Sequence, residues 1–475
     1  MPESLKDKTV KGVIWSSVER FSVQGVQFFV TLIIARILSP KDYGLVGMLS
    51  IFMAVSQSLI DSGFSQALIR KQNRTEIDNS TVFYFNIAVS SLLYLILFLI
   101  APWVADFYNE PQLTALMRVL CIVVVINSFA VVQRAIYTAT INFKTQAKAT
   151  FSATIISGIA GVIFALNGFG VWTLVYQQLL SAFLNTLMLW IYSNWRPQLI
   201  YSWKSFKELF SFGSNLLISG LLNTTYNNLY QLVIGKIFSA SSLGFYSQAK
   251  HITDLPSTNI NGIIGRVTYP VLSSIQNDDE RLSKNYRTIL RLSAFIIFPI
   301  MCLLAGVAHP LITLLIGEKW DFAATLTIPI CFSTMWYPVH AINLNLLKVK
   351  GRSDLFLRLE IIKKIIGVTV LTISIPFGLI FMCWASILSS LISLIINTYY
   401  TGKLIHVGFF VQMRDISATL VTALLAFTVA YLTCTYVKIP ILNLCIGLFA
   451  GGFVYWGTAY FLKFKELTYI KSIRK

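Results

Sequence analysis

The sequence predicts an all-α polytopic membrane protein with about fourteen transmembrane helices. Hydrophobic residues make up 56% of the 475 residues and charged residues only 12%, whereas soluble domains carry about 25% charged residues. The mean hydropathy is +0.69, and apolar stretches of about 20 residues, long enough to cross a bilayer, recur along the chain. These observations exclude soluble enzymes, nucleic-acid-binding proteins and disordered scaffolds.

The positions of the apolar stretches define the predicted helices. The connections between them are short, so we expect no extramembrane catalytic domain. The helices are predicted at approximately residues 12–38, 45–69, 81–105, 113–139, 147–167, 171–193, 207–238, 243–273, 288–316, 325–347, 355–375, 378–401, 416–436 and 440–462.

Basic residues alternate between the two sides of this predicted topology. The termini and the even-numbered loops hold 26 Lys and Arg, and the other loops hold three, Lys41, Lys319 and Lys438. Cytoplasmic loops carry the excess of Lys and Arg, so both termini are expected in the cytoplasm. The polar segment 1–11 leads into a helix too long and too polar for a cleavable signal, so we expect no removal of a leader.

An internal repeat relates the two halves of the chain. Residues 34–46 and 234–246 match at an offset of 200, with identical Ile, Ser and Gly residues. Both segments lie at the junction of the first and second helix of a half, and six helices separate them. The even number predicts two lobes of the same orientation, related by an axis along the membrane normal and suited to rocking about a central site.

A polar stripe on the first helix marks the predicted substrate cavity. Ser16, Arg20, Gln24, Gln27 and Thr31 recur at three- and four-residue spacing and therefore share a face. An Arg near the middle of a membrane costs about 2.5 to 3.5 kcal/mol, which favours a hydrated cavity over a lipid-facing position. The alternative for Arg20 is a structural ion pair with Glu19 or with a carboxylate on another helix.

The seventh helix repeats this stripe at the offset of 200. Its positions are Gly220, Thr224, Asn227 and Gln231. Exchangeable hydrogen bonds from such Gln, Asn and Thr side chains suit sugar hydroxyls. We therefore predict Gln24, Gln27, Thr31, Thr224, Asn227 and Gln231 as substrate-binding residues together with Arg20.

The eighth helix carries a second stripe that contains charges. Lys250, Asp254, Thr258 and Asn261 lie on nearly one face, and Pro256 is expected to interrupt the helix there. Lys250 is a predicted substrate contact, and an i,i+4 ion pair with Asp254 is the equally weighted alternative.

Four further residues complete the predicted site. Arg266 is a predicted substrate contact, although it lies around the helix from Lys250 and near the cytoplasmic end. Glu19, Asp61 and Asp254 are candidate coupling carboxylates, because carboxylates within a membrane often mark proton or sodium routes. For Asp61, a turn or helix-packing role within Asp61-Ser62-Gly63 is the favoured alternative.

Six sequence blocks resemble one family along nearly the whole chain. They are similar, in the same order, to blocks of the polysaccharide transporters of the MOP flippase superfamily, the Wzx-type oligosaccharide-lipid flippases, and most of all to the colanic-acid and teichuronic-acid exporter subgroup. The blocks are Ala35-Arg36-Ile37-Leu38-Ser39-Pro40 with Tyr43-Gly44, Asp61-Ser62-Gly63-Phe64 with Ala67-Leu68, Gly168-Phe169-Gly170-Val171-Trp172-Thr173-Leu174, Leu243-Gly244-Phe245-Tyr246, Pro270-Val271-Leu272-Ser273 and Gly317-Glu318-Lys319-Trp320.

The resemblance implies a fold and a function. It implies an N-terminal lobe at 1–200, a C-terminal lobe at 201–402, and a helix pair with a basic tail at 403–475. It also implies that the protein is no enzyme and moves undecaprenyl-pyrophosphate-linked oligosaccharides across the bacterial plasma membrane. Expected partners are this cargo, membrane lipids, and the polymerase and export machinery of the pathway. The segment Ala240-Ser241-Ser242 departs from the family pattern, since it lacks Pro and acidic residues.

Two other classes share parts of this profile. A MATE-like ion-coupled multidrug antiporter is also lobed, but it usually has twelve helices and a cationic cargo, which a net-positive cavity repels. A membrane-embedded polysaccharide polymerase would need a larger extramembrane loop. No nucleotide-binding loop and no His or Cys ligand pattern occurs in the sequence, so no cofactor, metal or nucleic-acid partner is expected.

Overall fold

A computed structural model describes residues 5–61, 64–71, 73–436, 439–467 and 469. Every regular element in these ranges is helical. The first part of the chain contains α1 (Leu5–Ile37), α2 (Pro40–Asp61), α3 (Phe64–Arg70), α4 (Glu76–Tyr108), α5 (Gln112–Leu120), α6 (Ile122–Ser128), α7 (Val131–Ala139), α8 (Phe143–Leu166), α9 (Trp172–Tyr192), α10 (Trp203–Asn227) and α11 (Leu229–Ile237). The second part contains α12 (Ala240–Ser273), α13 (Asp279–Gly306), α14 (Ala308–Ile316), η1 (Glu318–Trp320), α15 (Asp321–Thr334), α16 (Tyr337–Val349), α17 (Ser353–Ser374), η2 (Ile375–Phe377), α18 (Leu379–Ile405), α19 (Phe409–Tyr436) and α20 (Pro440–Phe461).

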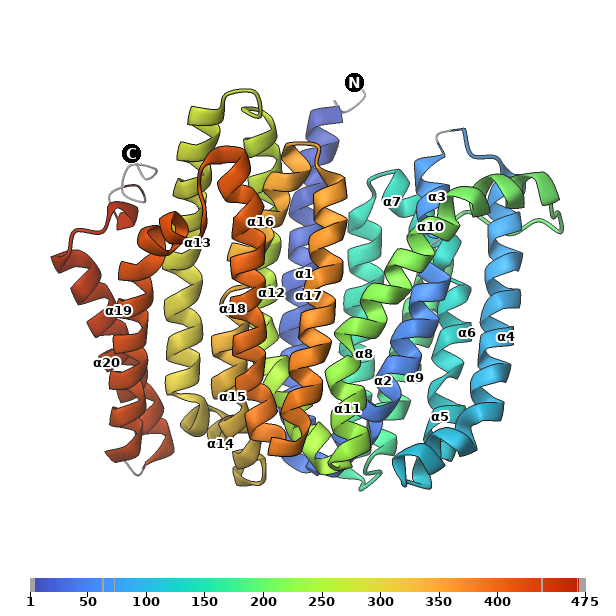
Figure 1. Cartoon of the computed structure of the whole chain (residues 1–475). Coiled ribbons are helices and arrows are strands. Elements are labelled where there is room, and N and C mark those ends of the chain that lie inside the picture. Colours follow the sequence, from blue (N-terminus) through green and yellow to red (C-terminus); the bar gives the residue numbers. More distant parts are fainter. Residues whose placement is uncertain (1–4, 62–63, 72, 437–438, 468, 470–475) are drawn as a thin grey trace. The chain divides into compact units, whose positions relative to one another are not determined.

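The chain divides into two compact units, Met1–Gly244 and Phe245–Lys475, and α12 begins in the first unit and continues in the second. In the first unit α1 packs on α8, α8 packs on α9, and both α10 and α11 pack on α2. In the second unit α13 packs on α19, and α18 packs on α15, α16 and α17. Helices α19 and α20 lie side by side in that unit (Figure 1).

Each predicted apolar stretch corresponds to one helix or to a run of broken helices. The stretch 113–139 forms α5, α6 and α7, with a bend of 42° between 112–128 and 131–139. The stretch 207–238 breaks at Asn228, and 288–316 breaks at Val307. Sequence hydropathy missed these breaks because the residues at them are compatible with either a helix or a turn.

Nine helices in the described ranges are long and apolar enough to cross a membrane, or ten if the bent pair forms one span. The protein is therefore a multi-pass integral membrane protein. Four of the fourteen predicted stretches fall outside this set. They are α1, the pair formed by α10 and α11, α12, and α17. The first three of these carry the predicted polar stripes. The count of fourteen spans is consistent with the structure, and these polar helices account for most of the difference.

The repeated segments meet in a reciprocal contact inside the first unit. A Cβ at Gly44 would lie 1.6 Å from the carbonyl oxygen of Ala240, and a Cβ at Gly244 would lie 1.9 Å from that of Pro40. Positions 40 and 240 are equivalent in the repeat, and so are 44 and 244. Each repeated segment therefore supplies one glycine and one backbone carbonyl to the contact. Only glycine permits this approach of the two backbones.

Helix α12 continues through Pro256 and also contains Pro270. The predicted interruption at Pro256 is therefore wrong. A proline removes one backbone donor, and flanking hydrogen bonds keep the remaining turns helical. In the turn after the proline, two hydroxyls also bond to the helix backbone: Ser257 Oγ donates to the carbonyl of Thr253 at 2.9 Å, and Thr258 Oγ1 donates to that of Asp254 at 2.6 Å.

Candidate functional site

The described part of the α1 stripe presents uncharged polar groups. Gln24 and Thr31 are half-buried and Gln27 is exposed. The Oε1 atom of Gln24 is buried and accepts no hydrogen bond from a described residue. A buried amide oxygen in this state is available to an external donor such as a hydroxyl group or water. The side chains of Glu19, Arg20 and Asp61 lie outside the described residues.

The second stripe lies where α10 gives way to α11. Thr224 is half-buried and Asn227 is exposed. Asn228, at the break between the helices, donates from Nδ2 to the carbonyl of Thr224 at 2.8 Å. The Oε1 atom of Gln231 accepts a hydrogen bond from Ser50 Oγ on α2 at 2.7 Å, which holds α11 to α2. No hydrogen bond between described side chains joins this stripe to that of α1.

The charged stripe on α12 belongs to the second unit. Lys250 Nζ lies 3.2 Å from Asp254 Oδ2, so the predicted i,i+4 ion pair forms. The two side chains are 29% and 32% exposed, so the pair is open on one side. Tyr337 on α16 is close enough to interact electrostatically with Lys250. Among the described side chains, Asn261 Oδ1 is a buried acceptor without a partner, and the side chain of Arg266 is not described.

The structure adds a polar cluster that sequence reasoning missed. His340 on α16 lies 3.1 Å from Ser390 Oγ and 3.2 Å from Asn397 Nδ2, both on α18. Lys363 on α17 pairs with Glu360 and acts electrostatically on His340. Helical spacing of polar residues within apolar stretches, His340 with Asn343 and Asn397 with Thr401, was the available signal.

A second polar cluster, here called the ladder, joins α16 and α18 to α19. The amide of Asn343 exchanges hydrogen bonds with Gln412 on α19, at 3.1 and 3.0 Å, and Thr401 Oγ1 donates to Asn343 Oδ1 at 2.7 Å. All three side chains are buried and have partners. Paired polar groups of this kind specify helix packing, so we assign this ladder a structural role.

The described parts of the polar stripes provide different polar groups in the two units. Neutral amides and hydroxyls line α1, α10 and α11, and a half-open Lys–Asp pair lies on α12. Within the described ranges, no three His, Cys, Asp or Glu side chains gather in a way that could hold a metal ion. Groups of this kind are suited to hydrogen bonds and ion pairs with polar or charged ligands.

The fold is similar to that of solved multi-pass transporters. The chain superposes on the lipid II flippase MurJ, in an inward closed conformation, with a TM-score of 0.77 and 13% identity, covering 95% of this chain and 99% of that chain. An inward-facing MATE-family multidrug transporter gives a TM-score of 0.64 at 16% identity and covers 83% and 98% of the two chains. At these identities the likeness defines the fold alone.

Residues 33–325 match the family described as polysaccharide biosynthesis protein, and the chain belongs to this family. The teichuronic acid biosynthesis protein TuaB of Bacillus subtilis strain 168 is 24% identical over 461 residues, 95% of either chain. The lipopolysaccharide biosynthesis protein WzxC of Escherichia coli strain K12 is 25% identical over 372 residues, 78% of this chain and 76% of that one. The resemblance predicted from the sequence blocks is confirmed.

Proposed function

We propose that the protein flips undecaprenyl-pyrophosphate-linked oligosaccharide repeat units from the cytoplasmic to the outer leaflet of the bacterial plasma membrane. The units serve capsule, exopolysaccharide or O-antigen export. Membership of the polysaccharide biosynthesis family over residues 33–325 carries this proposal. The full-length similarity to a teichuronic acid biosynthesis protein supports it. Both termini lie in the cytoplasm in this proposal, as the 26 to 3 distribution of basic residues predicts.

The proposed cargo explains the residue types on the polar helices. A pyrophosphate requires cationic donors, for which Arg20, Lys250 and Arg266 are the proposed groups. Sugar hydroxyls require exchangeable donors and acceptors, which Gln24, Gln27, Thr31, Thr224, Asn227 and Gln231 supply. Half-exposure of Lys250 and Asp254 supports this assignment, because a pair sealed on all sides could not exchange its partner for a phosphate.

Alternating access between the two units moves the cargo in this proposal, and the membrane potential drives it. An anion leaving a negative interior gains about 2.3 kcal/mol per charge per 100 mV. A pyrophosphate with about two charges therefore gains several kcal/mol without nucleotide hydrolysis. Coupling to protons or sodium would use Glu19, Asp61 or Asp254. The polymerase and export machinery of the same pathway then receive the flipped unit.

A pair of variants at the α12 ion pair tests the binding role of Lys250. Lys250→Gln should lower export at least tenfold, because it removes an ammonium group and leaves the Asp254 carboxylate uncompensated beside an anionic cargo. Export is measured in a deletion strain as lipid-linked oligosaccharide remaining on the cytoplasmic leaflet. Arg20→Ala should abolish export in the same assay. The exposed Lys403 belongs to none of the polar stripes and provides the control Lys403→Gln.

The double variant Lys250→Gln/Asp254→Asn separates substrate binding from a structural ion pair. It restores charge balance, so a purely structural pair predicts recovered export, and a phosphate-binding Lys250 predicts continued loss. Recovery would remove Lys250 from the proposed site. Two results together would favour a multidrug antiporter over a flippase. In the deletion strain, the lipid-linked oligosaccharide would be distributed normally between the leaflets, and the wild-type protein would export cationic drugs.

Proteoliposomes separate the two driving forces. With a membrane potential and no ion gradient, potential-driven transport should proceed at the full rate. If transport requires a proton or sodium gradient at constant potential, the carboxylates Glu19, Asp61 and Asp254 become the residues to substitute, each by its amide.

A further inference from the structure

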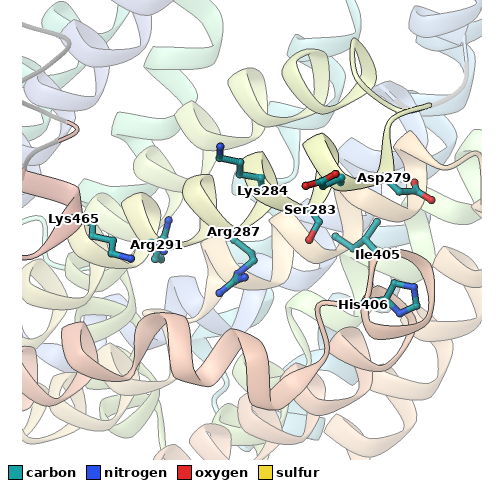
Figure 2. A pocket seen from close by; sticks show the side chains of 9 residues that line it. Asp279, Ser283, Lys284, Arg287, Arg291, Ile405, His406 and Lys465 are labelled. Atoms are coloured by element: carbon teal, nitrogen blue, oxygen red, sulfur yellow. The ribbon is translucent and has the colours of Figure 1, made fainter.

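A basic pocket opens at one end of α13 in the second unit, and no residue of the polar stripes lines it. Its volume is about 590 Å³, and it is lined by residues of α13, the α18–α19 connection and the segment after α20. Lys284, Arg287 and Arg291 line it from successive turns of α13. Figure 2 shows Lys465 beside Arg291 at one end of the pocket and His406 at the other end.

Two of the four cations form no ion pair with a carboxylate of the described residues, and of the two carboxylates that line the pocket, Asp279 pairs with Lys350. Arg287 forms a two-point contact with Asp415, with N···O distances of 2.6 and 2.7 Å, and Arg291 Nε lies 3.5 Å from Glu466. Lys284 and Lys465 are exposed and form no ion pair with another described residue. The pocket therefore combines two ammonium groups with arginine N–H donors that the carboxylates leave unused, the donor set that binds phosphate.

The chain holds Lys465 at this place by an anchor on each side. Phe464 is buried, and its ring lies 6.2 Å from that of Phe295 on α13. Glu466 is also buried and faces Arg291. Lys465 between them is exposed and lines the pocket. Its position is thus set by packing on the same helix that supplies the three other cations.

Exposed aromatic rings place the pocket at the depth of lipid headgroups. Phe410 in the first turn of α19 is 85% exposed, and Tyr460 and Phe461 at the end of α20 are 73% and 85% exposed. A Tyr ring is typical of the boundary between bilayer and water, and the two exposed Phe rings suit the apolar side of that boundary. The adjacent surface of α20 presents Phe449 and Phe453, which are 79% and 80% exposed and suit acyl chains.

We propose that this pocket binds the phosphodiester headgroup of an anionic glycerophospholipid on the side of the membrane where the basic loops lie. Basic pockets between transmembrane helices on this side recognise anionic headgroups. Lys284, Arg291 and Lys465 hold the phosphate. Glu280 and Ser283, which precede Lys284 on α13, accept hydrogen bonds from headgroup hydroxyls, as in phosphatidylglycerol. This site is distinct from the proposed cargo site and binds a resident lipid.

Lipid retention tests the proposal without measuring transport. The full chain is reconstituted in nanodiscs of phosphatidylcholine with a minor fraction of phosphatidylglycerol, extracted in mild detergent, and analysed by intact mass spectrometry for bound phosphatidylglycerol. The variant Lys284→Ala/Lys465→Ala should retain at least tenfold less than the wild type. The control Lys403→Ala/Arg414→Ala removes the same charge from exposed positions outside the pocket and should retain the wild-type amount.

Two results would overturn the proposal. Equal retention by the pocket variant and the wild type would show that the pocket does not hold phospholipid. In the second result, undecaprenyl phosphate would displace phosphatidylglycerol from the wild type and fail to bind to the pocket variant. That result would assign the pocket to the cargo. A charge-reversal variant, Lys465→Glu, should lower retention more than Lys465→Ala does, while the protein elutes as a single species. Because retention is independent of export, its failure leaves the proposed flippase activity to its own test.

Discussion

Helices α4 and α13 are the third membrane stretches of the two halves, yet their first turns lie in opposite environments. The start of α4 is covered by other parts of the chain. Asp78 is buried and accepts hydrogen bonds from Lys71 Nζ and from the Thr75 backbone, each at 3.0 Å. Burial alone would lower the pKa of the Lys71 amine, but the hydrogen bonds and charges of Asp78 and Glu208 raise it above its ordinary value. The start of α13 is instead open, because Asp279 and Glu280 in its first turn are exposed. The turns that follow carry the basic residues that line a pocket.

The length of one connection explains this difference. After the sixth stretch of the first half, residues 193–202 link α9 to α10 and cover the start of α4. The backbone N–H of Gln198 donates to Ser80 Oγ at 3.0 Å, and that of Ser202 donates to Thr81 Oγ1 at 3.1 Å. After the sixth stretch of the second half, only residues 406–408 link α18 to α19. This shorter link leaves α13 uncovered, and a pocket remains.

The largest expected effect tests the repeat on which this comparison rests. Gly44→Ala and Gly244→Ala should each destabilise the protein by at least about 3 kcal/mol, since the new methyl group would overlap a backbone carbonyl that cannot move aside. The readout is the apparent Tm in detergent together with the amount of protein in the membrane. On the same helix as Gly244, a Cβ at Gly265 meets nothing within 4 Å. Gly265→Ala should therefore be neutral or stabilising, by up to about 1 kcal/mol. Equal effects at all three sites would contradict the reciprocal contact.

Smaller effects are expected from substitutions at the starts of α4 and α13, which can be compared directly. Asp78→Ala should cost about 2 kcal/mol, because it breaks a buried capping box and leaves Lys71 with only Glu208. The equivalent position in the second half, Asp278, caps an exposed helix start by accepting from the Arg281 N–H at 2.9 Å. Asp278→Ala should cost about 1 kcal/mol. Thermal unfolding of the two variants side by side measures the difference, and a larger loss at Asp278 would refute the contrast between covered and open ends.

The smallest effect is expected at the pocket lysines. Lys284→Ala and Lys465→Ala should each change stability by no more than about 0.5 kcal/mol, because exposed side chains without ion pairs contribute little. The measurement is the apparent Tm in phosphatidylcholine nanodiscs, where the proposed ligand is absent. A loss above about 1 kcal/mol in either variant would mean that the pocket is part of the packing of α13 and not an open binding site.

Much of the fold could be predicted from the sequence because membrane insertion depends on local composition. The eighth predicted helix, 243–273, corresponds to α12 at Ala240–Ser273, and the last, 440–462, corresponds to α20 at Pro440–Phe461. The start of α13 lies at Asp279, earlier than the predicted 288. Its first turns are polar and project beyond the apolar stretch, so hydropathy did not include them. These missed turns are the ones that line the basic pocket.

The candidate site was less predictable. Spacing placed Lys250 beside Asp254, and the pair forms. Spacing did not reveal that Ser50 of α2 holds Gln231, or that His340 lies between Ser390 and Asn397. Such partners lie far apart in the chain, and a helical period relates only residues on the same helix.

The sequence by itself determined the class of protein, the order of its helices and the helices that carry polar faces, because each of these depends on residues that are neighbours in the chain. The tertiary structure decided which polar groups are paired and which stay open. Lys284 and Lys465 meet at one pocket only because α13 and the segment after α20 pack together. Gly44 meets Ala240 only because the two repeated segments pack against each other inside the first unit.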